Sequence, residues 1–120
     1  MIAVWIALAG GAGALARFVL DGAVRARLAS DFPWATVLIN VTGSFALGVL
    51  TGLVLFHGRP DDLRLILGTG FCGGYTTFST ASVETVRLAQ RGAVVAALGN
   101  ALGTLVLAVG AGALGLLVTR

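Results

Sequence analysis

The segment TGFCGGYTTFST, residues 69–80, combines glycines and hydroxyl side chains within a stretch, Leu65 to Val83, that contains no charged residue. Glycine weakens helical winding, so Gly70, Gly73 and Gly74 predict a break in a helix. A break within lipid leaves backbone N–H and C=O groups that protein, water or an ion must satisfy. These residue types therefore predict an ion or substrate site made of backbone and hydroxyl groups. A simple kink, repaired by neighbouring hydroxyls, is the alternative.

Residues 68–73 also match the glycine pattern G-x-G-x-x-G of dinucleotide-binding sites. That pattern needs a strand before it, a helix after it and an acidic residue about 20 positions later that binds the ribose. The last acidic residue of the chain is Glu84, and no alternation of strands and helices surrounds the motif. We therefore reject a nucleotide site.

The composition is that of a protein solvated by lipid. The chain is 58% hydrophobic and 11% charged, with a mean hydropathy of +0.99, whereas soluble domains carry about 25% charged residues. The net charge of +3 comes from arginine, and in a membrane protein its placement matters more than its sum, so we do not expect nucleic-acid binding. The single Cys72 and the single His57 form no metal cluster and no constellation for hydrolytic or redox catalysis, so an enzyme is not expected.

Four segments are apolar and long enough to cross a bilayer core, which takes about 20 helical residues. The sequence therefore predicts an all-α integral membrane protein with one multi-pass domain, residues 1–120, whose third helix is broken at the glycine-rich segment. Pro33 suits the start of the second helix and Gly58 its end. We expect no cleaved signal peptide, because no basic region precedes the first apolar run. The four spans cover about residues 2–24, 32–58, 63–88 and 92–119.

The arginines that flank the spans are balanced between the two sides of the membrane. Arginine bias fixes the orientation of a membrane protein, so we expect this chain to insert both ways up and to pair as an antiparallel dimer, unless another signal sets its topology. Pairs of small residues four apart support close helix association, within one chain or between two. These pairs are Gly10/Ala14, Gly48/Gly52 and Gly99/Gly103. The arginines that flank the spans are Arg59, Arg64 and Arg120 on the side of the termini, and Arg25, Arg27, Arg87 and Arg91 on the other side.

Polar residues within the spans are candidates for a pathway or for helix association. Asn40 lies in the middle of the second span, and its amide offers two N–H donors on a face shared with Thr36 and Ser44. Its alternative role is a hydrogen bond between helices. Arg17 is costly within a span and can pair with Asp21 one turn later.

Three motifs identify a family that the chain resembles. GGAGALARF (10–18), LINVTGSF (38–45) and GFCGGYTTFST (70–80) are similar to those of the small bacterial fluoride channels, and the resemblance covers essentially the whole chain. It implies an antiparallel, dual-topology dimer in the cell (inner) membrane that allows passive fluoride efflux and lowers cytoplasmic fluoride.

The resemblance also implies roles for individual residues. Asn40 matches a pore-lining Asn of the family, and Phe78 a pore-lining Phe whose electropositive ring edge can face an anion. The family has a second Phe where this chain has Ala81. Arg17 matches an Arg near the aqueous vestibule. The polar track of the family resembles the cluster Thr77, Ser79, Thr80, Ser82, Asn100 and Thr104.

A structural sodium ion is implied as well. Gly73 and Thr76 match the two positions whose backbone carbonyls, from both subunits, hold a sodium ion at the dimer centre of the family.

Two alternatives remain beside a homodimeric channel. The absence of the second Phe at Ala81 leaves open a partner subunit that has an incomplete pore of its own and forms a heterodimer with a homologous chain. A small multidrug-type transporter is less favoured, because such transporters need a carboxylate deep in a span. Glu84 lies near a span end and can pair with Arg87.

Overall fold

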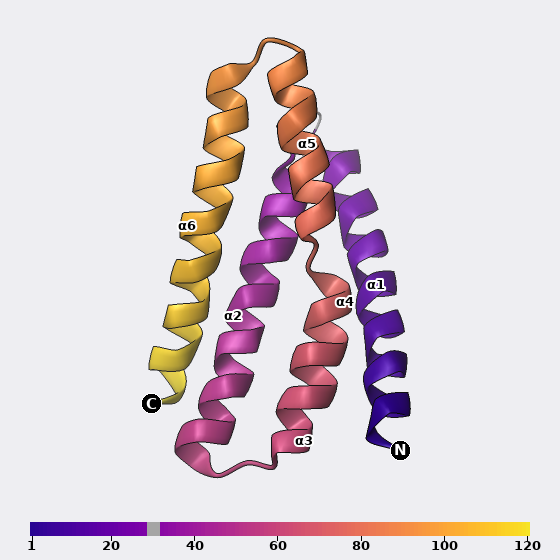
Figure 1. Cartoon of the computed structure of the whole chain (residues 1–120), viewed down its shortest axis with the longest axis vertical. Helices are drawn as coiled ribbons and strands as arrows, with labels where there is room; N and C mark the ends of the chain where they lie inside the picture. Colours follow the sequence, from indigo (N-terminus) through magenta and orange to yellow (C-terminus); the bar gives the residue numbers. More distant parts are fainter. Residues whose placement is uncertain (29–31) are drawn as a thin grey trace.

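The structure is a computed structural model that describes residues 1–28 and 32–120, and all regular structure in this part is helical. Figure 1 shows the long helices beside a column of shorter ones, with both chain ends at the same end of the molecule. The connection between the first two predicted spans, residues 25–31, lies partly outside the described residues. The elements are α1 Ile2–Arg27, α2 Trp34–His57, α3 Asp61–Leu63, the π-helix η1 Arg64–Cys72, α4 Gly73–Tyr75, α5 Phe78–Gln90 and α6 Val94–Thr119.

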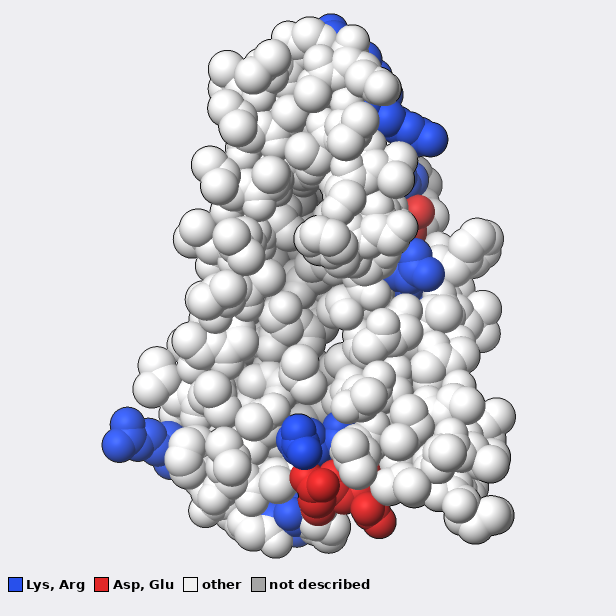
Figure 2. Space-filling model, viewed as in Figure 1, with Lys and Arg blue, Asp and Glu red and all other residues white. Residues whose placement is uncertain are grey.

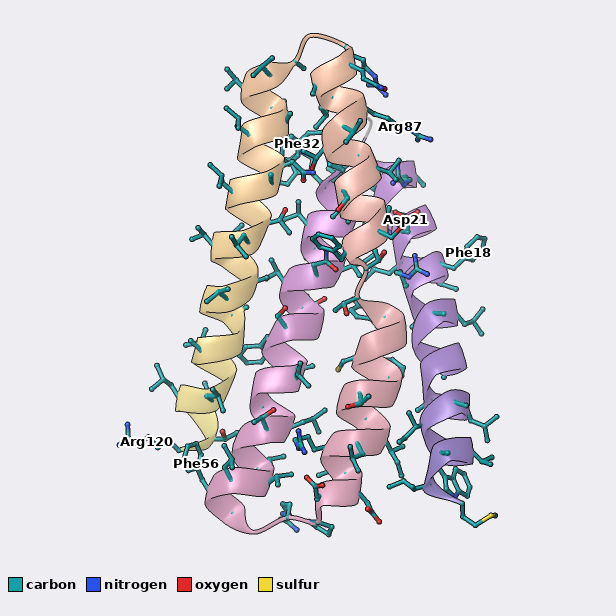
Figure 3. The ribbon with its side chains drawn as sticks, viewed as in Figure 1. Phe18, Asp21, Phe32, Phe56, Arg87 and Arg120 are labelled. Atoms are coloured by element: carbon teal, nitrogen blue, oxygen red, sulfur yellow. The ribbon has the colours of Figure 1, made fainter. Side chains whose placement is uncertain are left out.

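Helices α1, α2 and α6 are each long and apolar enough to cross a membrane. Their apolar side chains face outward: Phe18 on α1 points away from the bundle (Figure 3) and is 76% exposed. Together with the length and apolar character of these helices, outward-facing apolar surface of this extent marks a membrane contact. The chain is therefore a multi-pass membrane protein. The predicted third span, about residues 63–88, corresponds to the column formed by α3, η1, α4 and α5.

Helix α2 runs from Trp34 to His57, between the Pro33 and Gly58 that the sequence predicts at its two ends. Pro33 occupies the N-cap position directly before Trp34, where its missing N–H costs no helical hydrogen bond. Gly58 ends the helix with φ +64°, a left-handed conformation that glycine adopts without the steric cost of a Cβ. The Arg59 N–H then bonds to the Leu53 carbonyl at 3.2 Å.

Glycines let α1 pack directly on the backbone of η1 and α4. A Cβ at Gly13 would overlap the Phe71 carbonyl, and one at Gly74 would overlap the Gly10 carbonyl. Such overlap with backbone atoms cannot be relieved by a side-chain rotation. The α1–α4 seam, defined by Gly10, Gly13, Phe71 and Gly74, therefore tolerates no Cβ at Gly13 or Gly74.

A second glycine seam joins α2 to α6. A Cβ at Gly48 would overlap the Gly112 carbonyl, and one at Gly52 would overlap the side chain of Thr119. The Gly48/Gly52 pair therefore serves packing within the chain. In contrast, a Cβ at Gly99 or Gly103 would meet nothing within 4 Å.

The ion pairs at the C-terminal end of α1 differ from the predicted ones. Asp21 bonds to Arg25, at 2.9 Å, and not to Arg17. Glu84 bonds to the same Arg25, also at 2.9 Å, and not to Arg87, which points away from α5 (Figure 3). Asp21 has an arginine four residues away on either side. Glu84 lies beside Arg25, so the guanidinium of Arg25 binds both carboxylates. The shared Arg25 joins α5 to α1.

Candidate functional site

The chain is extended at Thr76 and Thr77, between α4 and α5 (Figure 1). Thr76 has φ −81° and ψ 155°, and Thr77 has φ −147° and ψ 117°. Thr77 is also the N-cap of α5, because its hydroxyl accepts a hydrogen bond from the Thr80 N–H at 3.2 Å. The two extended residues lie within the TTFST part of the motif.

Asn40 on α2 binds the backbone of this extended segment with both ends of its amide. Its Nδ2 donates to the Thr77 carbonyl at 3.1 Å, and its Oδ1 accepts from the Thr77 N–H at 2.9 Å. The side chain is buried, with 9% exposed. Asn40 therefore replaces the helical partners that Thr77 has lost, and it does so from a different helix. One N–H of its amide remains for another acceptor.

These bonds release the carbonyls of Gly73 and Thr76. In an unbroken α-helix each carbonyl accepts from the N–H four residues later, which would be Thr77 for Gly73 and Thr80 for Thr76. Here the Thr77 N–H bonds to Asn40, and the Thr80 N–H bonds to the Thr77 hydroxyl. Both carbonyls thereby lose the donors that an unbroken helix would supply.

A cavity of about 790 Å³ lies beside the break, between α2, η1, α5 and α6. Figure 2 shows this face hollowed along the middle of the molecule. The cavity brings together eight of the predicted site residues, whereas Ser79, Thr80 and Arg17 do not line it. The eight are Asn40, Gly73, Thr76, Thr77, Phe78, Ser82, Asn100 and Thr104.

Within the cavity, Asn100 links α6 to α5. Its Nδ2 donates to the Thr85 hydroxyl at 2.7 Å, and its Oδ1 accepts from the Thr104 hydroxyl at 3.4 Å. Asn100 is 1% exposed, so its amide is held by these contacts. Thr85 was not predicted as a site residue, although a hydroxyl in register with Ser82 on the same helix could have indicated it.

Phe78 and Ala81 line the same cavity. Phe78 is the first residue of α5 and is 87% exposed in the single chain. The methyl group of Ala81, less than one turn further on, leaves the space beside this ring without a second aromatic side chain.

Arg17 lies on α1, and its Nε is buried with no hydrogen-bond partner among the described residues. It follows Gly13 by four residues, on the face of α1 that packs against Phe71 and Tyr75. Its role at a vestibule stays a prediction.

Comparison with known proteins places the chain in a family. The profile of the family described as "CrcB-like protein, Camphor Resistance (CrcB)" matches residues 4–116. The chain belongs to this family. Its relatives include "Fluoride-specific ion channel FluC 1" of Leifsonia xyli, which is 57% identical over 97% of this chain and 85% of the relative. "Fluoride-specific ion channel FluC 2" of Cutibacterium acnes is 53% identical over 74% of this chain and 73% of the relative. The protein of the same name in Mycobacterium tuberculosis is 46% identical over 95% of this chain and 89% of the relative.

Proposed function

We propose that this chain is a subunit of a fluoride-selective ion channel that allows passive fluoride efflux across the cell membrane and so lowers cytoplasmic fluoride. The observation that carries this proposal is the 57% identity, over 97% of the chain, with a protein named as a fluoride-specific ion channel. A channel moves an ion down its gradient without chemical change, so the protein is not an enzyme.

The polar groups around the break suit a small anion. Fluoride is strongly hydrated, and a pathway must replace its water with donors that do not retain it. Asn40, with one N–H remaining, and the hydroxyl residue Ser82 line the cavity and supply neutral donors, whereas the Thr77 hydroxyl donates to the Thr80 Oγ1 at 3.2 Å. The exposed ring of Phe78 adds an electropositive edge, which attracts an anion less strongly than a formal cation would. We infer that Ser79, Thr80, Asn100 and Thr104 extend this pathway and that Arg17 raises the local anion concentration at its mouth.

The column from α3 to α5 is, on this proposal, the fourth membrane crossing, broken at the level of the cavity. A cavity that opens to the side of a single chain would contain lipid, which cannot satisfy the released carbonyls. A second chain in the opposite orientation would close it and give eight helices around the pathway. The balanced arginines support insertion of the same chain both ways up.

A structural sodium ion fits the same arrangement. The carbonyls of Gly73 and Thr76 have lost the donors of an unbroken helix, and carbonyl oxygens are ligands suited to hard cations. We infer that these carbonyls, from two antiparallel chains, hold the ion at the dimer centre. Its positive charge would satisfy the oxygens and join the two subunits.

The partner of this chain can be a second copy or a homologous subunit. Ala81 provides no second aromatic ring in the cavity, and relatives bear the names FluC 1 and FluC 2, as expected of paralogous chains. A multidrug-type transporter is disfavoured, because the carboxylates of Asp21 and Glu84 are both bound to Arg25.

Reconstitution of the purified chain into liposomes tests the proposal. We expect it to release trapped fluoride and to retain trapped chloride, measured with ion-selective electrodes. Release that appears only after a homologous subunit is added would assign this chain the role of a heterodimer partner. Release of neither ion, alone or with such a subunit, would contradict the proposed function.

A further inference from the structure

Tyr75, the last residue of α4, makes a side-chain hydrogen bond to α2 immediately before the break. Its phenol oxygen lies 2.9 Å from the Oγ1 of Thr42. The single hydroxyl hydrogen of Thr42 has acceptors in its own helix, because Oγ1 lies 2.8 Å from the Leu38 carbonyl and 3.2 Å from the Ile39 carbonyl. Thr42 therefore donates within α2, and the Tyr75 O–H donates to Thr42.

The ring of Tyr75 is held in place by its neighbours. It stacks on Phe71 with ring centroids 6.0 Å apart and an interplanar angle of 15°. Gly43 of α2 provides the space that the ring occupies: a Cβ at Gly43 would lie 3.1 Å from ring atom Cδ2 and would overlap the methyl group of Thr76. The phenol group is therefore aimed at Thr42 by the packing of the ring.

We propose that the Tyr75–Thr42 hydrogen bond is a positioning contact for the ion pathway, a role that rests on the proposed function. Helix α2 then binds the chain on both sides of Thr76, through Thr42 before it and through Asn40 after it. Tyr75 fixes the end of α4 so that Thr77, two residues later, meets the amide of Asn40. The orientation of the Thr76 carbonyl is set between these two bonds.

The environment makes such a contact persistent. In a membrane no water competes for the two hydroxyl groups, so a hydrogen bond between helices is retained. Without it, α2 would hold the extended segment through Asn40. The loss of one such bond corresponds to a change of about fivefold in the equilibrium between closed and open forms of the break.

Hydrogen–deuterium exchange of the peptide that contains Thr77 tests this proposal. Tyr75→Phe keeps the ring and its stacking but removes the donor, and Thr42→Val removes the acceptor. We expect each variant to speed exchange at Thr77 by about fivefold and to lower fluoride efflux per reconstituted protein severalfold. Because both variants remove the same bond, the double variant should match either single one.

Two controls separate positioning from general stability. Thr42→Ser retains the acceptor and should restore the exchange rate and the efflux of the unmodified chain. Thr51→Val removes an α2 hydroxyl whose bond, within the part of the chain that the structure describes, goes to the Leu47 carbonyl of its own helix, and it should change neither quantity. Unchanged exchange at Thr77 in Tyr75→Phe, or additive effects in the double variant, would overturn the positioning role. If the variants change exchange at Thr77 as expected but the unmodified chain never conducts fluoride, the Tyr75–Thr42 contact is upheld and the proposed function is refuted.

Discussion

Replacement of Asn40 is expected to stop fluoride efflux. Asn40→Ala leaves the N–H and the carbonyl of Thr77 without partners, and each unpaired buried group costs about 1–3 kcal/mol. A cost of about 2–6 kcal/mol against the conducting conformation lowers efflux by about 30-fold or more. The measurement is the initial rate of fluoride efflux from liposomes that contain equal amounts of protein.

Asn40→Asp disturbs both the contact of the amide with Thr77 and its place in the ion pathway. It keeps an oxygen for the Thr77 N–H, but it places a negative charge against the Thr77 carbonyl and in the way of an anion, so efflux should again be suppressed. Thr51→Val on the same helix is the control and should conduct like the unmodified chain. Normal efflux through Asn40→Ala would remove Asn40 from both the break and the pathway.

The second large effect is expected at the α1–α4 seam. Gly13→Ala places a methyl group on the Phe71 carbonyl, and overpacking of this kind costs about 1–3 kcal/mol, more where backbone must move. We expect a lower melting temperature in detergent and a loss of fluoride efflux, because α4 can no longer dock on α1 beside the break.

Gly11→Ala is the matched control for this variant. Gly11 lies on the same helix two residues earlier, and a Cβ there would meet nothing within 4 Å. An Ala in the interior of a helix is favoured over Gly by about 1 kcal/mol, so Gly11→Ala should leave the melting temperature unchanged or raise it. Equal melting temperatures for the two variants would show that the seam does not depend on Gly13.

The parts of the fold that depend on local chemistry could be predicted from the sequence. Pro33 and Gly58 bound α2 as expected, because a missing N–H and a positive φ act at a single residue. The π-helix Arg64–Cys72 could not be predicted, since its i→i+5 bonding has no distinct residue pattern.

Contacts between residues that are far apart in the sequence were harder to predict. The sequence indicated that the backbone at the break needs partners and that Asn40 is a donor, but the two were not connected, because 37 positions separate Asn40 from Thr77. The ion pairs show the same limit. The predicted pairings of Asp21 and Glu84 were wrong. Asp21 has arginines at equal spacing on both sides, so spacing could not choose between them, and the partner of Glu84, Arg25, lies 59 positions away.

Measuring the orientation of the chain in the membrane tests the antiparallel pair most directly. Because the second chain of that pair is what closes the cavity, the same measurement tests the closure of the cavity. Asp62, in α3, and Gln90, the last residue of α5, lie at opposite ends of the column α3–α5, and replacing them leaves the arginine balance unchanged. In a Cys72→Ala background, single Asp62→Cys and Gln90→Cys reporters are labelled in sealed vesicles with a membrane-impermeant maleimide. We predict that about half of each reporter reacts from outside, as expected of copies inserted both ways up. Complete labelling of one reporter with full protection of the other would establish a single orientation and contradict an antiparallel pair of identical chains.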